Sequence, residues 1–304
     1  MIKRTLFFGN PAYLSTKNSQ LVVKQTDKVT QEEVTKTVPI EDIGVVVLED
    51  RQITITNVAL DALLQNNCAV ITCDEKHMPS GLLLPIEGNT IQSERFNNQI
   101  NASLPLKKQL WQQTVQAKIR NQASVLKRLS GIEVGCMFAW ANDVKSGDSD
   151  NLEGRAAAYY WKNIFPNLPG FTRDREGEMP NNLLNYGYAV VRAVVARALV
   201  ASGLLPTLGI HHHNRYNAFC LADDIMEPYR PYVDELVINI MRSGADYGEL
   251  GTDLKRQLLG LPVTEVVIGG QRSPMMIAAS QTTSSLCKCF SGEARKITYP
   301  TMDI

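Results

Sequence analysis

The chain has 304 residues, of which 44% are hydrophobic and 20% charged, and its 31 basic side chains balance its 31 acidic ones. This composition belongs to a globular protein with one large domain or two ordinary ones, and it excludes a disordered tail, a collagen-like fibre and a coiled coil. Because there is no net basic field, binding to a polyanion would need a local excess of positive charge.

The chain shows no secretion signal or membrane span. The apolar run near its start, residues 6–8, is too short for a signal peptide. The longest apolar stretch, residues 186–210, contains Arg192 and Arg197, and two arginines near its middle argue against a membrane span. The six cysteines include no Cys-x-x-Cys pair and are expected to be reduced thiols. We therefore expect a cytoplasmic protein.

The chain up to residue 95 reads as a small β-rich domain. Its short segments are rich in Val, Thr, Leu and Phe, and turn residues separate several of them. Strands are expected at residues 4–8, 13–16, 21–25, 33–39, 44–48, 53–56, 69–73 and 78–84. Residues 57–65 have the apolar spacing of one short helix.

Residues 96–132 carry six basic side chains and no acidic one, and their apolar residues recur at helical spacing. A solvated helix face usually mixes both signs of charge, so a run without carboxylates favours contact with phosphates, the alternative being an ordinary solvated face. The six basic residues are Lys107, Lys108, Lys118, Arg120, Lys127 and Arg128.

The pattern downstream stays helical. Helices are expected at residues 182–202 and 229–241, and a short extended segment at 263–268. The sequence thus predicts an α+β protein, with an N-terminal β-domain over residues 1–95 followed by a larger, all-α catalytic domain over residues 96–304.

Common nucleotide-binding and hydrolase motifs are absent from the sequence. There is no G-x-x-x-x-G-K-[ST], no G-x-G-x-x-G after a strand and no G-x-S-x-G. A P-loop NTPase, a Rossmann dehydrogenase and a serine-triad hydrolase therefore have no support.

Three of the four histidines are consecutive, at residues 211–213, and Asp223, Asp224 and Glu227 follow them. Imidazole and carboxylate groups this close in sequence can converge on one divalent cation, and mostly oxygen ligands suit Mg²⁺ or Mn²⁺ better than a structural Zn²⁺. The alternatives are that the histidines lie in a solvated loop and that Asp224 and Glu227 form a capping box before the next helix.

Glu153 is the second candidate ligand. It shares a helical face with Ala157, Tyr160 and Ile164, which should be buried, and a carboxylate there needs a partner. A cation held jointly with other residues would provide one, and a salt bridge to an arginine would provide another. The residue also fits the third position of a helix that is capped by Asp150.

These segments resemble the CRISPR-associated integrase and endonuclease of spacer acquisition, the "Cas-one" family, and most closely its type II branch. The resemblance runs in order through the helical half and extends to the β-domain. Its segments are Glu153 with AAAYYW at 156–161, NLLNYGY at 182–188, LGIHH at 208–212 and LADDIMEPYRP at 221–231.

The resemblance implies a metal-dependent site in which Glu153, His212 and Glu227 are both the ligands of Mg²⁺ or Mn²⁺ and the catalytic residues. His211 or His213 could replace His212 as the ligand, because the three histidines are adjacent. Asp224 would be a near neighbour that orients the site or caps the helix.

The implied activity is insertion of short DNA fragments into a CRISPR repeat array by 3′-hydroxyl attack on a phosphodiester, for antiviral defence. The alternatives are a stand-alone metal-dependent nuclease acting on branched DNA and a non-catalytic DNA-binding scaffold. DNA backbone contact is expected from the six basic residues above and from a second group. That group comprises Arg173, Arg175, Arg242, Lys255 and Arg256.

The resemblance also implies partners. These are double-stranded DNA, a second copy of the chain joined through the β-domain, and a small companion CRISPR-associated protein whose dimer is flanked by two integrase dimers. A type II system can add its effector nuclease and an accessory protein. No membrane is involved.

Overall fold

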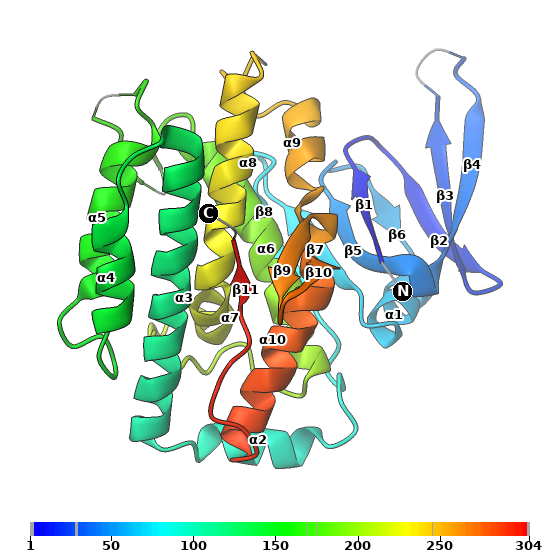
Figure 1. Ribbon diagram of the computed structural model, residues 1–304. Coiled ribbons are helices and arrows are strands. Elements are labelled where there is room, and N and C mark those ends of the chain that lie inside the picture. The colour runs from blue at the N-terminus through cyan, green and yellow to red at the C-terminus, as the bar shows by residue number, and fades with distance from the viewer. Residues whose placement is uncertain (1–2, 28–29, 169, 175, 245, 303–304) are drawn as a thin grey trace. The chain divides into compact units, whose positions relative to one another are not determined.

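Strands dominate the first part of the chain and helices the rest, in two separate units, Met1–Gly88 and Asn89–Ile304 (Figure 1). The computed structural model describes residues 3–27, 30–168, 170–174, 176–244 and 246–302. The expected order of a β-rich part and a helical part is therefore confirmed.

The division between the units follows Gly88, whereas the sequence placed it after residue 95. Helix α2 (Gln92–Ile100) packs against α10 (Met275–Phe290) and so belongs to the helical unit. The residues before it are tied to the same unit, since the side chain of Asn89 donates a 3.0 Å hydrogen bond to the carbonyl of Ala201.

The described residues of the N-terminal unit form two four-stranded sheets and one α-helix, α1 (Asn57–Gln65). One sheet has the order β1-β5-β7-β8 and the other the order β4-β3-β2-β6. The strands are β1 (Arg4–Phe8), β2 (Tyr13–Lys17), β3 (Gln20–Thr26), β4 (Glu33–Pro39), β5 (Ile43–Leu48), β6 (Thr54–Ile55), β7 (Ala69–Cys73) and β8 (Pro79–Leu83).

Strand β5 is the buried centre of the first sheet. It pairs in parallel with β1 on one side and β7 on the other, and five of its six residues are buried. A strand covered on both faces needs a continuous apolar run, which the sequence IGVVVL supplies. Helix α1 begins where the hydroxyl of Thr56 accepts a 3.3 Å hydrogen bond from the N–H of Ala59, as an N-cap does.

The helical unit consists of helices and one small sheet. Besides α2 and α10, its helices are α3 (Leu104–Ser130), α4 (Gly135–Asp143), α5 (Leu152–Ile164), α6 (Asn181–Ala201), α7 (Cys220–Met226), α8 (Arg230–Arg242) and α9 (Thr252–Leu258). Short 3₁₀ turns η2 (Glu227–Tyr229) and η3 (Leu261–Val263) join some of them. Strands β9 (Glu265–Ile268), β10 (Gln271–Pro274) and β11 (Pro300–Thr301) form an antiparallel sheet, of which the sequence indicated only the extended segment at 263–268.

Helix α6 is the core of this unit, in contact with α7, α8, α9 and α10. It is long and apolar enough to cross a membrane, but 83% of its most apolar window is buried inside the fold, as in a core helix. A Cβ atom at Gly187 would come within 2.4 Å of the side chain of Val233, so glycine lets α6 and α8 approach closely.

Helix α3 is the long helix against which the functional elements pack. The hydroxyl of Ser103 caps its first turn, and Gly131 ends it in the left-handed conformation at φ 64°. Near its middle, the buried Asn121 donates to the carbonyls of Pro228 (2.8 Å) and Pro300 (3.0 Å) and accepts from the N–H of Met302 (3.1 Å). One side chain of α3 therefore fixes both η2 and the C-terminal strand.

A buried carboxyl group joins three of the helices. Asp234 of α8 accepts hydrogen bonds from the hydroxyls of Tyr160 of α5 (2.9 Å) and Tyr188 of α6 (2.5 Å), and it is 1% exposed. Burial raises the pKa of Asp234 to about 6, although both hydrogen bonds and the charges of Arg230 and Arg173 oppose the rise. The carboxyl group of Asp234 thus joins α5, α6 and α8 through hydrogen bonds, and its ionisation lowers the stability of the folded chain.

We expect the stability contributed by Asp234 to fall as the pH rises. Its pKa is higher in the folded chain than in the unfolded one, so the contribution is complete below pH ~4 and is lost as the pH passes through about 6. Relative to Asp234→Asn, the wild type should lose up to about 3 kcal/mol of unfolding free energy between pH 4 and 7, measured by urea unfolding. A wild-type advantage that grows with pH would contradict this.

Candidate active site

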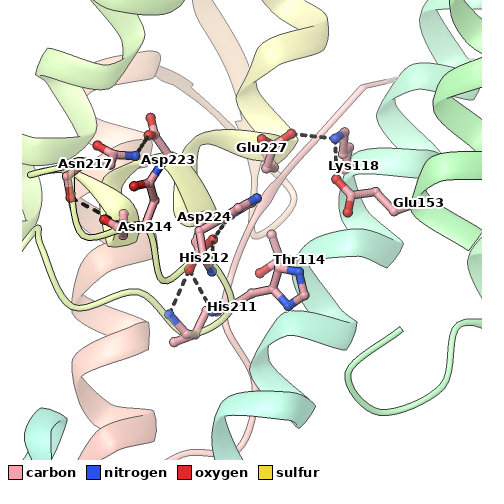
Figure 2. A network of polar contacts seen from close by, with 12 residues as sticks. Thr114, Lys118, Glu153, His211, His212, Asn214, Asn217, Asp223, Asp224 and Glu227 are labelled. Carbon is pink, nitrogen blue, oxygen red and sulfur yellow. Dashed lines mark hydrogen bonds and ion pairs between the residues drawn. The ribbon is translucent and has the colours of Figure 1, made fainter. Parts of the chain in front are cut away.

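The candidate site lies where α3, α5, η2 and the loop before α7 meet in the helical unit. Glu153 comes from the first turn of α5, Glu227 from the start of η2, and His212 from the loop that leads into α7. Lys118 reaches towards both glutamates from α3 (Figure 2).

The ammonium group of Lys118 bridges the two glutamates. Its Nζ lies 2.6 Å from Oε1 of Glu153 and 2.6 Å from Oε2 of Glu227. The exposed fractions of the side chains are 12% for Lys118, 23% for Glu153 and 5% for Glu227. The second oxygen of Glu227, Oε1, pairs with Nε of Arg230 at 3.0 Å. Two carboxylates that are distant in sequence thus already share one cationic group.

The charges at this bridge keep both partners ionised. Burial alone would raise the pKa of Glu227, but the charges of Arg230 and Lys118 outweigh burial, so the pKa is lowered. Burial likewise opposes the ionised form of Lys118, yet the charges of Glu227 and Glu153 raise its pKa above the ordinary value. The contact is therefore a true ion pair at neutral pH.

The carboxylate of Asp224 organises the histidine loop. It is fully buried, and its Oδ2 accepts hydrogen bonds from the backbone N–H groups of Ile210 (2.7 Å) and His211 (2.9 Å). Its Oδ1 accepts from the N–H of His212 at 3.3 Å and lies 2.5 Å from Nδ1 of the same residue. A Cβ at Gly209 would come within 2.8 Å of Asp224 and 2.4 Å of the His212 carbonyl, so the loop needs glycine there.

The three adjacent histidines have different surroundings. The bond to Asp224 is the main reason that the pKa of His212 is raised, and it places a proton on Nδ1, which leaves Nε2 to act as a ligand when the ring is neutral. The ring of His211 stacks on Trp111 of α3, with centroids 4.1 Å apart and planes 2° apart, and burial lowers its pKa. His213 is exposed. The environment therefore favours His212 over its two neighbours as the ligand.

The structure brings together Glu153 and Glu227 but places Lys118 at the point where they meet. Among the described residues, no three His, Cys, Asp or Glu side chains are arranged so that they could hold a metal ion directly. The charges of both glutamates contribute to the raised pKa of His212, so the ring lies within their electrostatic reach. Asp223 is turned elsewhere, to Arg192 (2.6 Å) and Asn217 (2.7 Å).

The donor set nevertheless fits a hard divalent cation. Two carboxylate oxygens already contact one cationic position, and oxygen donors with one imidazole suit Mg²⁺ or Mn²⁺. Oε2 of Glu227 is buried, and its described contact is the 2.6 Å ion pair with Lys118. The predicted ligand set of Glu153, His212 and Glu227 stays a prediction, with these contacts in its favour.

Both capping interpretations are wrong. Asp224 lies inside α7, where its oxygens bind the loop at residues 210–212, and no side chain caps α8. Helix α5 is capped by Asn151, whose side chain accepts from the N–H of Gly154, and not by Asp150, which pairs with Lys145 at 2.7 Å. The spacing of Asp224 and Asp150 fits a helix cap, but Asp224 binds the backbone of an upstream loop and Asp150 binds the side chain of Lys145.

The structure also changes the set of basic residues that could contact DNA. Lys118 is not available to DNA in this structure, because it is 12% exposed and engaged in the ion pairs described above. Lys255 is only 6% exposed. Arg173 donates to the side chains of Asn181 (3.0 Å) and Asn185 (2.5 Å), so it is engaged within the fold.

The remaining basic residues keep at least part of their side chains in solvent. Arg128 pairs with Glu235 at 2.6 Å and remains 35% exposed. Arg175 lies outside the described residues. Side chains with no such ion pair among the described contacts are Lys107, which is half-buried, and the exposed Lys108, Arg120, Lys127 and Arg242.

Sequence reasoning missed three residues that build the site. Lys118 was assigned to DNA because it belongs to a basic run, Arg230 was noticed only as part of a motif, and Asn121 carried no signal. The expected salt-bridge partner of Glu153 was an arginine, whereas the structure supplies a lysine. The apolar spacing of residues 110–126 would have placed Lys118 beside the buried face of its helix.

The sequence matches one protein family over most of its length. The family described as "CRISPR associated protein Cas1" matches residues 6–247, so the chain belongs to the Cas1 family. The CRISPR-associated endonuclease Cas1 of Neisseria meningitidis serogroup C (strain 8013) is 37% identical over 286 residues, which cover 94% of this chain and 91% of that relative.

Solved structures share the fold over nearly the whole chain. A casposase bound to an integration product superposes with a TM-score of 0.81 at 22% identity, covering 98% of this chain and 92% of that one. A chain of a Cas6-RT-Cas1–Cas2 complex gives a TM-score of 0.73 at 21% identity, covering 96% of this chain and 35% of that one. At these identities the likeness shows the fold alone.

We expect Asp224→Asn to destabilise the chain by about 2–3 kcal/mol in urea unfolding at neutral pH. An amide cannot accept from every donor that the carboxylate serves, because its NH₂ group would face an N–H donor in either orientation. Asp253→Asn is the control, since this residue is 86% exposed in its pair with Arg256 and should change stability by less than about 0.5 kcal/mol. Equal effects of the two substitutions would contradict the role of Asp224.

Proposed function

We propose that this chain is a metal-dependent DNA integrase and endonuclease that inserts short DNA fragments into a CRISPR repeat array, the spacer acquisition step of antiviral defence. The observation that carries the proposal is the convergence of Glu153 and Glu227, from separate elements, on one cationic position, with His212 within the electrostatic reach of both. The name of the Neisseria relative, an endonuclease, and the integration product bound to the casposase support the same activity.

Glu153, Glu227 and His212 would hold the cation, Mg²⁺ or Mn²⁺. Such an ion, when bound, stabilises negative charge on a phosphate oxygen. The buried Asp224 keeps the ring of His212 oriented through Nδ1, as carboxylates do for metal-binding histidines. Arg230 keeps Glu227 ionised and holds one of its two oxygens, so that the other remains directed at the site.

The reaction is an exchange of phosphodiester bonds. The 3′-oxygen of the incoming fragment forms a new bond to phosphorus and loses its proton, while the bond from phosphorus to the 3′-oxygen of the repeat strand breaks and that oxygen gains a proton. With water in place of the 3′-hydroxyl, the same exchange cleaves the strand. Neither reaction consumes a nucleotide, in agreement with a sequence that has no P-loop.

The basic residues of α3 that reach solvent are proposed to contact the DNA backbone. Lys107, Lys108, Arg120 and Lys127 lie along this helix, and Arg242 lies at the end of α8. Contacts to phosphates position DNA without reading its sequence, and they weaken as salt concentration rises.

The proposal includes partners and location. The chain would act in the cytoplasm as a homodimer joined through its β-rich unit, with two dimers flanking a dimer of a small companion protein. The presence of Cas1 and Cas2 in one of the structurally similar complexes supports such a companion. A type II effector nuclease and an accessory protein would be further partners, and no membrane would take part.

Glu153→Gln should reduce joining of a 3′-hydroxyl DNA fragment to a repeat-bearing plasmid by at least about 100-fold in the presence of Mn²⁺. The substitution removes the negative charge of the proposed ligand Glu153 but keeps the size and shape of its side chain. The matched control is Glu235→Gln, a glutamate that pairs with a cationic side chain of the same helix α3 and should keep wild-type joining. The assay is run with and without the companion protein, on variants whose circular dichroism melts match the wild type.

Other results would favour the competing functions. Cleavage of branched DNA without joining would indicate a stand-alone nuclease. Binding of DNA with neither joining nor cleavage would indicate a scaffold. Joining by Glu153→Gln at the wild-type rate would refute the proposed metal site.

A further inference from the structure

The ammonium group of Lys118 occupies the position that a metal ion would need. It lies 2.6 Å from one oxygen of each glutamate, and both of these oxygens point toward it (Figure 2). A divalent cation that contacted the same two oxygens would lie almost on top of the ammonium nitrogen. Steric overlap alone therefore prevents both cations from binding in these positions.

Electrostatics leads to the same conclusion. A singly charged ammonium and a doubly charged ion repel each other strongly at contact distance in a site that is largely shielded from water. Without either cation, the two carboxylates would lie close together with only Arg230, on the far oxygen of Glu227, to offset their charge, which is also unfavourable. The site is therefore built to hold one cation at a time between Glu153 and Glu227.

We propose that Lys118 is the resident counter-ion of the site, and that a divalent cation binds by displacing its ammonium group from Glu153 and Glu227. This inference rests on the proposed function, because it takes these two glutamates as ligands of the metal.

Several contacts fit such an exchange. Arg230 holds Oε1 of Glu227 independently, so Glu227 keeps its orientation when Lys118 leaves Oε2. Among the described contacts, Lys118 is the one group that holds Oε2, so a metal ion would have to replace that single partner there. Glu153 is 23% exposed, so the exchange can proceed from the solvent side of the bridge. A lysine side chain has four carbons joined by rotatable bonds, so the ammonium group of Lys118 can move while α3 stays in place.

The displaced ammonium remains tethered to the site. Lys118 lies on the same helix as the basic side chains that reach solvent. Once released from the carboxylates, its charge is available to a phosphate bound next to the metal. Metal binding would thus convert Lys118 from an internal counter-ion into a group that binds DNA.

Lys118→Met tests the exchange by metal affinity, without any activity measurement. Because the competing cation is gone, Mn²⁺ should bind at least about tenfold more tightly in isothermal titration calorimetry. The metal-free variant should melt roughly 5–10 °C below the wild type, because the two carboxylates lose the cation that they share, and Mn²⁺ should restore most of that loss.

Arg128→Met is the matched control. Arg128 also lies on α3 and also forms a 2.6 Å ion pair with a glutamate, Glu235, but outside the site. This variant should keep the wild-type Mn²⁺ affinity. Lys118→Gln, which retains polar contacts to the carboxylates without the charge, replaces Lys118→Met if the latter does not fold, and it should show the same gain in affinity.

An unchanged or weaker Mn²⁺ affinity in both Lys118 variants would overturn the exchange. If the wild type still joins DNA and Glu153→Gln still weakens Mn²⁺ binding, the proposed function stands and only the role of Lys118 is wrong. If neither the wild type nor the Lys118 variants bind Mn²⁺, the three side chains form a structural ion pair and both proposals fail.

Discussion

The helical unit depends on one electrostatic constraint: two carboxylates from different elements can lie together in the interior only with a cation between them. Lys118 provides that cation, and it joins α3 to α5 through Glu153 and α3 to η2 through Glu227. The attraction is large only because the groups are shielded from water, and that shielding also makes the loss of any one partner costly. The geometry of the candidate site and the packing of three elements are therefore set by the same contacts.

Hydrogen bonds to two further buried carboxyl groups support this charged centre from two sides. Asp224 gathers the backbone of residues 210–212, which fixes the position of His212, while Asp234 joins α5, α6 and α8 through two tyrosine hydroxyls. Neither carboxylate is part of the bridge itself. Asp224 fixes the loop that carries His212, and Asp234 fixes how α5 packs against α6 and α8, so both support the site from outside the bridge.

Local patterns predicted the elements well, and long-range partners could not be predicted. Helix 57–65 and strands 33–39 and 69–73 have the expected bounds, because apolar spacing and turn residues are local properties. Lys118 and Glu153 are 35 positions apart, and no spacing rule relates residues at that distance. The capping role that spacing allowed for Asp224 was wrong for the same reason, since its partners lie up to 14 positions upstream in a loop. The candidate ligands themselves came from a family resemblance.

The hydrogen bonds of Asn121 have a practical consequence for handling the protein. The same side chain holds the carbonyl of Pro228, next to Glu227, and the backbone of Pro300 and Met302 near the C-terminal end. A purification tag or fusion partner attached at that end could disturb the backbone of Pro300 and Met302. Asn121 would then lose hydrogen bonds that keep it in place beside Pro228 and the candidate ligand Glu227. Recombinant versions of the chain are therefore better extended at the N-terminus, which lies in the other unit.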